Sequence, residues 1–196
     1  MIVVNPVEID YKRLAEVAKP CRGKINRIYL HWTAGHYGDV YDDYHLNIGP
    51  DGELYLTCTE FTELKAHTWR RNSGSIGIAM CCAYGASAIR GSETNFGKEP
   101  PTQKQIEAMS KAVAVLAYAL GLEIKLLTVT THCEAALFDG YGPHSGDPET
   151  RWDLWFLPDR PLTEKLVPGG NVIRGKAQWY RQFIGRFGNV LTWAAK

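Results

Sequence analysis

The sequence predicts an α/β or α+β domain with a central sheet, and three observations support this prediction. Apolar, strand-like runs recur along the chain, and one long amphipathic helix lies among them. The chain has 196 residues, which fits one domain with a small appendage. Its 45% of hydrophobic residues can fill an ordinary core.

Five segments are predicted to be strands. Residues 25–31 and 75–82 are apolar and rich in β-branched or aromatic residues. Residues 44–48 and 53–57 lie on either side of the turn-forming tetrapeptide GPDG. Residues 126–131 form a further apolar run that ends at a histidine. Together these segments can form one sheet.

The clearest helix follows Thr102, which can cap it while Gln105 completes a capping box. Apolar residues then recur at helical spacing from Ile106 to Leu120, and Gly121 marks the end. A shorter amphipathic helix is predicted over residues 10–18.

The chain is predicted to divide into a main domain over residues 1–158, a linker over 159–171 and a C-terminal helical extension over 172–196. The linker is rich in proline and glycine, and the extension mixes basic and aromatic residues. We expect the extension to pack on the domain as a helix.

Composition excludes several classes of protein. A net charge of +1 gives no reason to expect binding to nucleic acid or to an acidic membrane. We expect no membrane insertion, because no apolar run is long enough to span a bilayer. The first residues lack the pattern of a signal peptide, so we expect a cytoplasmic location when the protein is made. The five cysteines include no CxxC pair, which argues for reduced thiols and against a zinc ribbon.

Two of the six histidines share a sequence context that suggests a metal site. His31 and His132 each end an apolar run and precede a loop, so neighbouring strands would bring both imidazoles to one edge of the sheet. Catalytic zinc takes three protein ligands and keeps one position open. Asp147, on the loop after His132, is the predicted third ligand. The alternative is that each histidine is structural and hydrogen-bonded.

Six stretches of sequence then support a resemblance. In chain order they are IYLHWTAG, DDYHLNIGPDGELY, KAHTWRRNSGSIGIAM, PPTQKQIEAMSKAVAVLAYAL, VTTHCEAA and GDPETRWD, spread over residues 25–157. They resemble, in the same order, motifs of the type-2 N-acetylmuramoyl-L-alanine amidase and peptidoglycan-recognition-protein family, which includes phage endolysins. The resemblance implies an α/β fold with a central mixed β-sheet flanked by helices.

The resemblance also implies roles for individual residues. It makes Zn²⁺ the expected cofactor, and Tyr44 matches a tyrosine that lies beside the metal in some members. The implied zinc ligands are His31, His132 and Asp147, and the implied substrate-binding residues are His67, Asn72 and Trp32.

The sequence departs from the family at two places that bear on catalysis. Some members carry a glutamate directly after Ser-Ile-Gly-Ile, where this chain has Ala79, and others carry a lysine two residues before the third ligand, where it has Ser145. The general acid is therefore left open between Tyr44, His144 and Glu134. Glu134 would share the face of His132 if that strand continued, although a capping or solvated role is preferred for it. The fallback third ligands are Asp153 and Glu149, and Asp153 is otherwise expected to anchor its loop by packing.

The implied activity is zinc-dependent hydrolysis of the amide between N-acetylmuramic acid and L-alanine in peptidoglycan. The expected form is a monomeric phage or prophage endolysin that acts on the cell wall after release. The alternatives are a cytosolic amidase that recycles muropeptides and a non-catalytic peptidoglycan-binding module.

Overall fold

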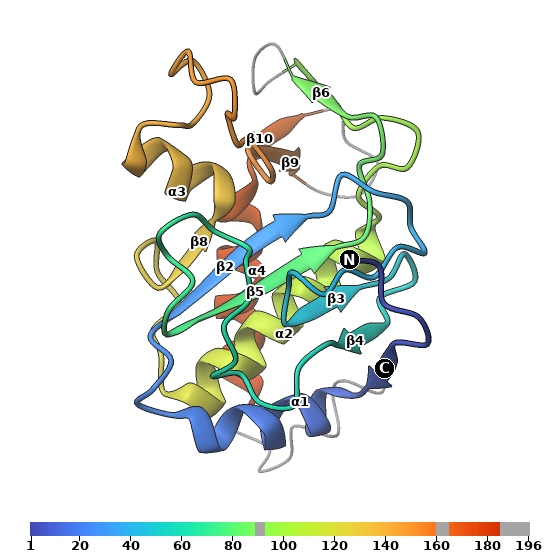
Figure 1. The fold of residues 1–196 in the computed structure, drawn as a ribbon. Helices are drawn as coiled ribbons and strands as arrows, with labels where there is room; N and C mark the ends of the chain where they lie inside the picture. The colour runs from blue at the N-terminus through green and yellow to red at the C-terminus, as the bar shows by residue number, and fades with distance from the viewer. Residues whose placement is uncertain (89–92, 160–164, 185–196) are drawn as a thin grey trace.

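The fold is built on a six-stranded mixed sheet with the strand order β1-β4-β3-β5-β2-β8 (Figure 1). The computed structural model describes residues 1–88, 93–159 and 165–184. Strands β3, β5, β2 and β8 are parallel to one another, and β4 and β1 continue the sheet in antiparallel pairs. The strands in this order are β1 (Val7–Ile9), β4 (Leu54–Leu56), β3 (Leu46–Ile48), β5 (Ser75–Met80), β2 (Arg27–Trp32) and β8 (Val129–Thr131).

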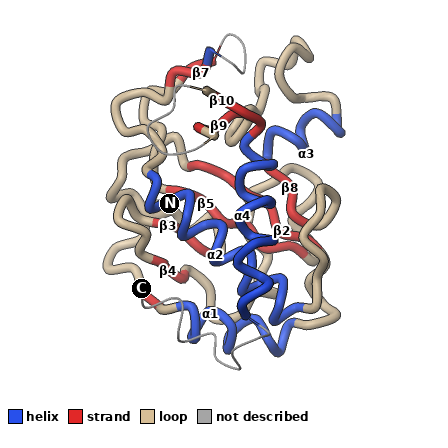
Figure 2. The backbone as a smooth tube through the Cα atoms, turned by 180° about the vertical axis from the view of Figure 1, so that it is seen from behind, coloured by secondary structure: helices blue, strands red, loops and turns tan. Residues whose placement is uncertain are grey.

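Helices α2 and α4 cover one face of the sheet, as the view from behind shows (Figure 2). The helices are α1 (Tyr11–Ala18), α2 (Gln103–Leu120), α3 (His132–Asp139) and α4 (Gly169–Ile184). The smaller elements are η1 (Lys19–Cys21) and two short hairpins, β6 (Ser87–Ala88) with β7 (Thr94–Asn95) and β9 (Phe156–Pro158) with β10 (Leu166–Pro168). None of the described helices is long and apolar enough to cross a bilayer.

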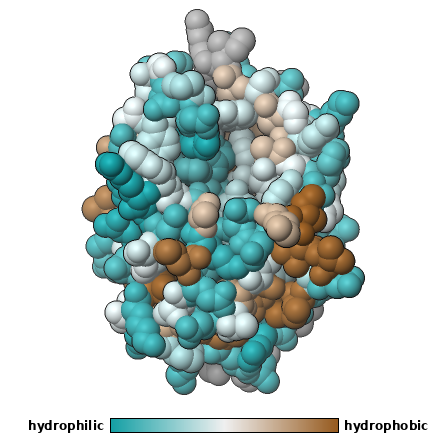
Figure 3. All heavy atoms as spheres, viewed as in Figure 1, coloured by the Kyte–Doolittle hydropathy of each residue, from teal (hydrophilic) through white to brown (hydrophobic). Residues whose placement is uncertain are grey.

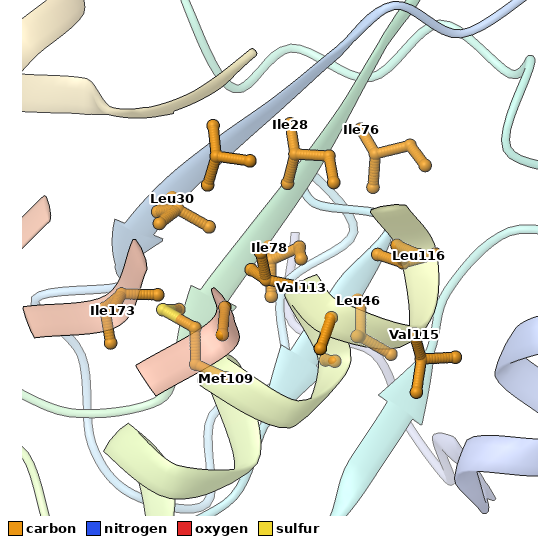
Figure 4. Packing of buried hydrophobic residues seen from close by; sticks show 14 of the residues in the cluster. Ile28, Leu30, Leu46, Ile76, Ile78, Met109, Val113, Val115, Leu116 and Ile173 are labelled. Atoms are coloured by element: carbon orange, nitrogen blue, oxygen red, sulfur yellow. The ribbon is translucent and has the colours of Figure 1, made fainter. Parts of the chain in front are cut away.

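Alternation along the strands separates a dry core from a polar face. Side chains at every second position of β2, β3 and β5 point at α2, and Ile173 of α4 packs beside them (Figure 4). The strand residues drawn in this core are Ile28, Leu30, Leu46, Ile76 and Ile78. The residues between them have their side chains on the opposite face of the sheet.

That opposite face is covered by a loop, residues 57–74, which crosses in front of β5 and β2 (Figure 1). His67 of this loop contacts the ring of Tyr29, with 5.9 Å between the ring centroids. It also lies directly over Gly77, where a Cβ atom would come within 2.5 Å of the His67 Cγ atom. The glycine of the Ser-Ile-Gly-Ile segment thus makes room for a buried histidine.

Replacing Gly77 with alanine is expected to displace His67 and to lower the free energy of unfolding by about 1–3 kcal/mol, because the strand is buried and cannot yield. Chemical denaturation measures this loss. The matched control is Gly175→Ala on α4, where an added Cβ meets nothing within 4 Å. That substitution should stabilise the helix by about 0.5–1 kcal/mol. Equal effects of the two substitutions would contradict the close packing at Gly77.

The sequence-based prediction of a central mixed sheet flanked by helices is confirmed. The long helix has the predicted limits, with a complete capping box at Thr102 and a left-handed Gly121 after its last residue. Helix α1 begins at Tyr11, one residue after the predicted start, and Asp10 caps it by accepting a hydrogen bond from the Arg13 N–H.

The structure differs from the prediction after residue 131 and after residue 158. The chain turns into helix α3 at His132, with Thr131 and Glu134 forming a capping box, so the strand does not continue. The predicted linker, 159–171, holds strand β10 and the first residues of α4, and its residues 160–164 lie outside the described part. Helix α4 begins at Gly169 and packs along α2 with its buried residues Ile173 and Ala177. Residues 185–196 of the predicted extension also lie outside it.

Candidate metal centre

Three side chains converge on the polar face of the sheet: His31, His132 and Asp153. The His31 Nδ1 atom is 3.2 Å from the His132 Nδ1 atom and 3.0 Å from an Asp153 carboxylate oxygen. The other Asp153 oxygen is 3.2 Å from the His132 Nδ1 atom. All three residues are buried, and His31 is completely inaccessible. Two imidazole nitrogens and one carboxylate oxygen thus point at a common spot.

Strand pairing explains how the two histidines meet. His31 lies inside β2, one residue before its end, and alternation turns its ring away from the helices. Strand β8 pairs with β2 in parallel register, with Leu30 opposite Thr131. The next residue, His132, opens helix α3 and so lies beside His31. The histidines therefore meet above the face of the sheet, whereas the sequence suggested a meeting at its edge.

A tight turn positions Asp153. The Trp155 N–H donates to the Trp152 carbonyl across this turn, and the Cys133 N–H donates to the Asp153 carbonyl. The next residue, Leu154, is fully buried and fixes the turn to the core. The carboxylate is thereby held against the start of α3.

The electrostatics favour a neutral His31 and an ionised Asp153. Burial lowers the pKa of His31 to about 4, although the hydrogen bond to Asp153 acts in the opposite direction. For Asp153, burial alone would raise the pKa, but attraction to His132 and hydrogen bonds from both histidines lower the pKa well below its usual range. Neutral imidazole and carboxylate are the protonation states that bind a divalent metal.

The donor set fits zinc. Two imidazole nitrogens and one carboxylate oxygen make three protein ligands, as catalytic zinc sites have, and leave further positions for water and substrate. The second ring nitrogen of His31 lies 3.4 Å from the hydroxyl oxygen of Thr68, a contact of the kind that orients metal-binding histidines. His31, His132 and Asp153 are the residues that would hold the ion.

This geometry corrects the predicted third ligand, Asp147. The Asp147 side chain is exposed and accepts a hydrogen bond from the Glu149 N–H within its own turn. Asp147 and Glu149 line the outer cleft, but only Asp153 joins the two histidines. Asp153 and Glu149 were the two alternatives that the sequence offered for the third ligand, and the structure favours Asp153. The preference for Asp147 came from reading the Asp-Pro pair as the ligand motif.

Two of the predicted catalytic candidates lie elsewhere. Glu134 sits in the first turn of α3, where its carboxylate accepts from the Thr131 N–H and forms a two-point ion pair with Arg174 at 2.7 and 2.8 Å. His144 is exposed and packs its ring against Trp155, at 5.6 Å between centroids. Neither side chain belongs to the group of candidate metal ligands, because the helix and the outer loop turn them away.

Tyr44, the third catalytic candidate, does lie beside the group. Its ring is 5.0 Å from the ring of His31, between centroids. Burial, followed by repulsion from the nearby Asp153 carboxylate, raises the pKa of Tyr44 well above its usual range. The phenol therefore stays protonated at any working pH and can donate a hydrogen bond.

An open cleft with two arms lies over His31, His132 and Asp153. Figure 3 shows this face of the molecule hollowed in its upper half. The first arm has a volume of about 560 Å³ and the second about 390 Å³. His67, His132 and Arg151 line both arms, so the arms meet at the metal-binding donors.

The structure places all three predicted substrate-binding residues at this cleft. His67 and Asn72 line the first arm, and Trp32 lines the second. The Asn72 side chain also accepts from the Thr68 N–H, which fixes the loop that carries His67. Trp32 is mostly buried and packs edge-on against Trp152 at 5.3 Å, so it contributes a wall and little exposed surface.

Sequence reasoning missed Thr68, Tyr141 and Arg151. Tyr141 lines the first arm, 6.2 Å from the His132 ring, and its buried hydroxyl has no hydrogen-bond partner among the described residues. Arg151 stands two residues before Asp153. That spacing could have been recognised once Asp153, and not Asp147, was taken as the ligand.

His45 is a structural neighbour of the centre. Its Nε2 atom is 2.8 Å from the Glu63 carbonyl and donates to it, while its Nδ1 atom accepts from the Gly77 N–H at 3.0 Å. Burial lowers the pKa of His45 to about 4. A proton added to the Nδ1 atom would point at the Gly77 N–H and remove this acceptor, so the folded state holds His45 neutral.

The folded protein should therefore lose stability as the pH falls below about 6.5, the pKa of an unfolded histidine. The contribution of His45 is fully present above that value and is lost on approaching pH 4. Between pH 7 and pH 5 it amounts to about 2 kcal/mol. Urea unfolding of chelator-treated protein measures the stability lost between pH 7 and pH 5. This loss should be about 2 kcal/mol smaller in His45→Gln than in the unmodified protein. An identical loss in both proteins would contradict the assignment.

Together, the fold and the converging donors define an α/β protein with a candidate metal centre in an open cleft. The family model described as N-acetylmuramoyl-L-alanine amidase (Amidase_2) matches residues 22–150, about two thirds of the chain. The chain therefore belongs to this amidase family.

A search of curated proteins gave no match. Among solved structures, PGRP-Hd from Alvinella pompejana is similar at 19% identity and a TM-score of 0.38, over 66% of this chain and 79% of that one.

Proposed function

We propose that the protein hydrolyses the amide between N-acetylmuramic acid and L-alanine of peptidoglycan with a zinc ion held by His31, His132 and Asp153. The single observation that carries this proposal is the convergence of these three donors, at 3.0 to 3.2 Å, under an open cleft. Membership of the amidase family supports the choice of substrate.

A zinc ion in this position supplies Lewis acidity toward the amide carbonyl and toward the attacking water. The chain supplies the rest. Tyr44 donates a hydrogen bond to the oxygen on which negative charge develops, since its phenol stays protonated beside the donors. Arg151, which is paired with Glu149 at 3.0 Å, lines both arms of the cleft and brings a guanidinium to the same region. It stands two residues before Asp153, where some members of the family carry a lysine.

Ala79 faces the centre, and its methyl side chain cannot transfer a proton. It pairs with His31 in the register of β5 and β2 and is fully buried. Family members with a glutamate at this place have a carboxylate next to the metal. Glu134 and His144, the other two predicted proton donors, are committed to contacts elsewhere.

Replacing Tyr44 by phenylalanine is expected to lower kcat by about 10²-fold, the usual cost of one donor to a developing oxyanion. Zinc content, measured by atomic absorption, should stay the same because Tyr44 is not a ligand. The matched control is Tyr118→Phe on the outer side of α2, where the ring is 41% exposed. An unchanged kcat in Tyr44→Phe would exclude the proposed role.

Purified cell walls provide the test of the activity. Zinc-loaded protein should clear a suspension of walls, and both chelation and His132→Ala should abolish clearing while wall binding persists. Re-addition of zinc should restore clearing only in the unmodified protein. Protein that binds walls but never clears them, with or without zinc, would instead be a non-catalytic peptidoglycan-binding module.

We further propose that the protein acts as an endolysin on intact wall after release from the cytoplasm. The observation that favours this over a recycling amidase is Ala79, since recycling members of the family carry a glutamate at this place. The comparison is between insoluble wall and soluble anhydro-muropeptides at equal concentrations of cleavable bonds. Faster cleavage of insoluble wall supports the endolysin, and a strong preference for the soluble fragments contradicts it.

A further inference from the structure

A basic pocket lies next to the first arm of the cleft. It has a volume of about 370 Å³ and is lined by Arg27, Trp69, Arg70, Arg71 and Asp139. Trp69 also lines the first arm, so the pocket and the arm share a wall. The indole is 55% exposed and packs edge-on against Tyr141 at 5.7 Å. A ligand lying in the first arm can therefore continue past Trp69 into the basic pocket.

The pocket carries more positive than negative charge. Arg71 forms a two-point ion pair with Asp139, with both distances 2.6 Å, and this pair ties the loop to the end of α3. Arg70 instead stacks over the Trp69 ring at 4.3 Å, and Arg27 reaches the Tyr29 hydroxyl at 3.5 Å. Within the described part of the chain, Asp139 is the one acidic residue that lines this pocket. Two guanidinium groups therefore remain available for an added anion.

The distance between the basic pocket and the three candidate metal ligands suggests which anion the pocket binds. Arg27, Tyr29 and His31 occupy alternate positions of β2 and so lie on one face of the sheet. Four residues of strand span about 13 Å. An extended peptide covers the same distance in about four residues. A peptide whose first amide lies at His31 would thus place its fourth residue near Arg27.

We infer that the basic pocket binds the C-terminal carboxylate of a four-residue stem peptide and makes the enzyme selective for peptides that end in a free acid. This inference rests on the proposed amidase function and adds a specificity site to it. Guanidinium groups suit this role because they bind carboxylates in a planar, two-point manner. Arg27 and Arg70 select the substrate, and Arg71 holds the pocket in shape.

Matched synthetic substrates provide the test. The substrates are N-acetylmuramoyl tetrapeptides that differ only in a C-terminal carboxylate or carboxamide, together with the corresponding pair of dipeptides. The zinc-loaded protein should cleave the tetrapeptide acid with a kcat/KM about tenfold above that of its amide. The dipeptides are too short to reach the pocket, so the acid and the amide should differ by less than about twofold.

The variant Arg27→Gln/Arg70→Gln should reduce the tetrapeptide preference to within about twofold while cleavage of the dipeptides stays unchanged. The matched control is Lys12→Gln/Arg13→Gln, which removes two charges from the exposed side of α1 and should keep the full preference. Equal cleavage of acid and amide by the unmodified protein would overturn the inference and leave the amidase intact. A preference that survives in Arg27→Gln/Arg70→Gln would also overturn it. No cleavage of any substrate would instead overturn the proposed function, and this inference with it.

Discussion

Asp153→Asn is expected to lose the bound zinc and to lower kcat/KM for wall cleavage by about 10³-fold or more. The substitution keeps the size of the side chain but removes the charge that two buried imidazoles face at 3.0 and 3.2 Å. A neutral amide oxygen is a much poorer zinc ligand than a carboxylate. Zinc stoichiometry by mass spectrometry and the rate of wall clearing measure the two effects.

The control for this prediction is Asp147→Asn, which removes the same charge from an exposed turn six residues earlier. Its carboxylate accepts only from the Glu149 N–H among the contacts of the described chain, so zinc content should not change. Retention of zinc in Asp153→Asn together with its loss in Asp147→Asn would reverse the assignment. The pair of variants therefore decides between the two aspartates directly.

Arg174→Met is expected to lower the free energy of unfolding by about 3 kcal/mol, the largest effect on stability that we predict. The Arg174 side chain is only 10% exposed and donates to Glu134, to the Val129 carbonyl and to Asn171. Removing the guanidinium leaves the Glu134 carboxylate, itself 21% exposed, without its cation. The loss should appear in urea denaturation of the metal-free protein.

The matched control is Lys104→Met, which breaks the ion pair with Asp51 at the same distance, 2.7 Å, but with both side chains about two thirds exposed. Lys104→Met should lower the free energy of unfolding by at most about 1 kcal/mol. Glu134→Gln adds a test of function, because a structural Glu134 predicts that kcat of the zinc-loaded protein changes by less than about threefold. A loss of kcat without a loss of stability in Glu134→Gln would return this residue to the list of catalytic groups.

The sequence predicted the fold well where local signals and tertiary structure agree. Capping residues and helical periodicity defined α2, because Thr102, Gln105 and Gly121 act through contacts within a few residues of themselves. The strands were recognised by their apolar runs, although the structure shortens β3 to Leu46–Ile48 and β4 to Leu54–Leu56. The ends of strands depend on their partners, which a single sequence does not show.

The site was only partly predictable because it depends on contacts between distant segments. His31 and His132 could be paired from matching contexts, since each lies at the end of an apolar run and the two runs form parallel strands that lie side by side. The third ligand could not be read in the same way. Asp147 and Asp153 both follow His132, and only the turn from Trp152 to Trp155 and the burial of Leu154 bring one of them inward.

Glu134 shows a second limit of reading the sequence. Its position two residues after His132 suggested a shared face if the strand continued. The same residue completes a capping box with Thr131, and that signal belongs to a helix. The capping signal decides the local structure, and Arg174, 40 residues further along the chain, then holds the carboxylate away from the centre.

Analysis of the cleavage products tests the central claim most directly. A defined muramoyl peptide is incubated with zinc-loaded protein, and the products are identified by mass spectrometry. The predicted result is free N-acetylmuramic acid together with a peptide that carries a new N-terminal alanine, formed only when zinc is bound and only with Asp153 in place. An intact muramoyl peptide, or cleavage at any other bond, would contradict the proposal that the protein is a zinc-dependent N-acetylmuramoyl-L-alanine amidase.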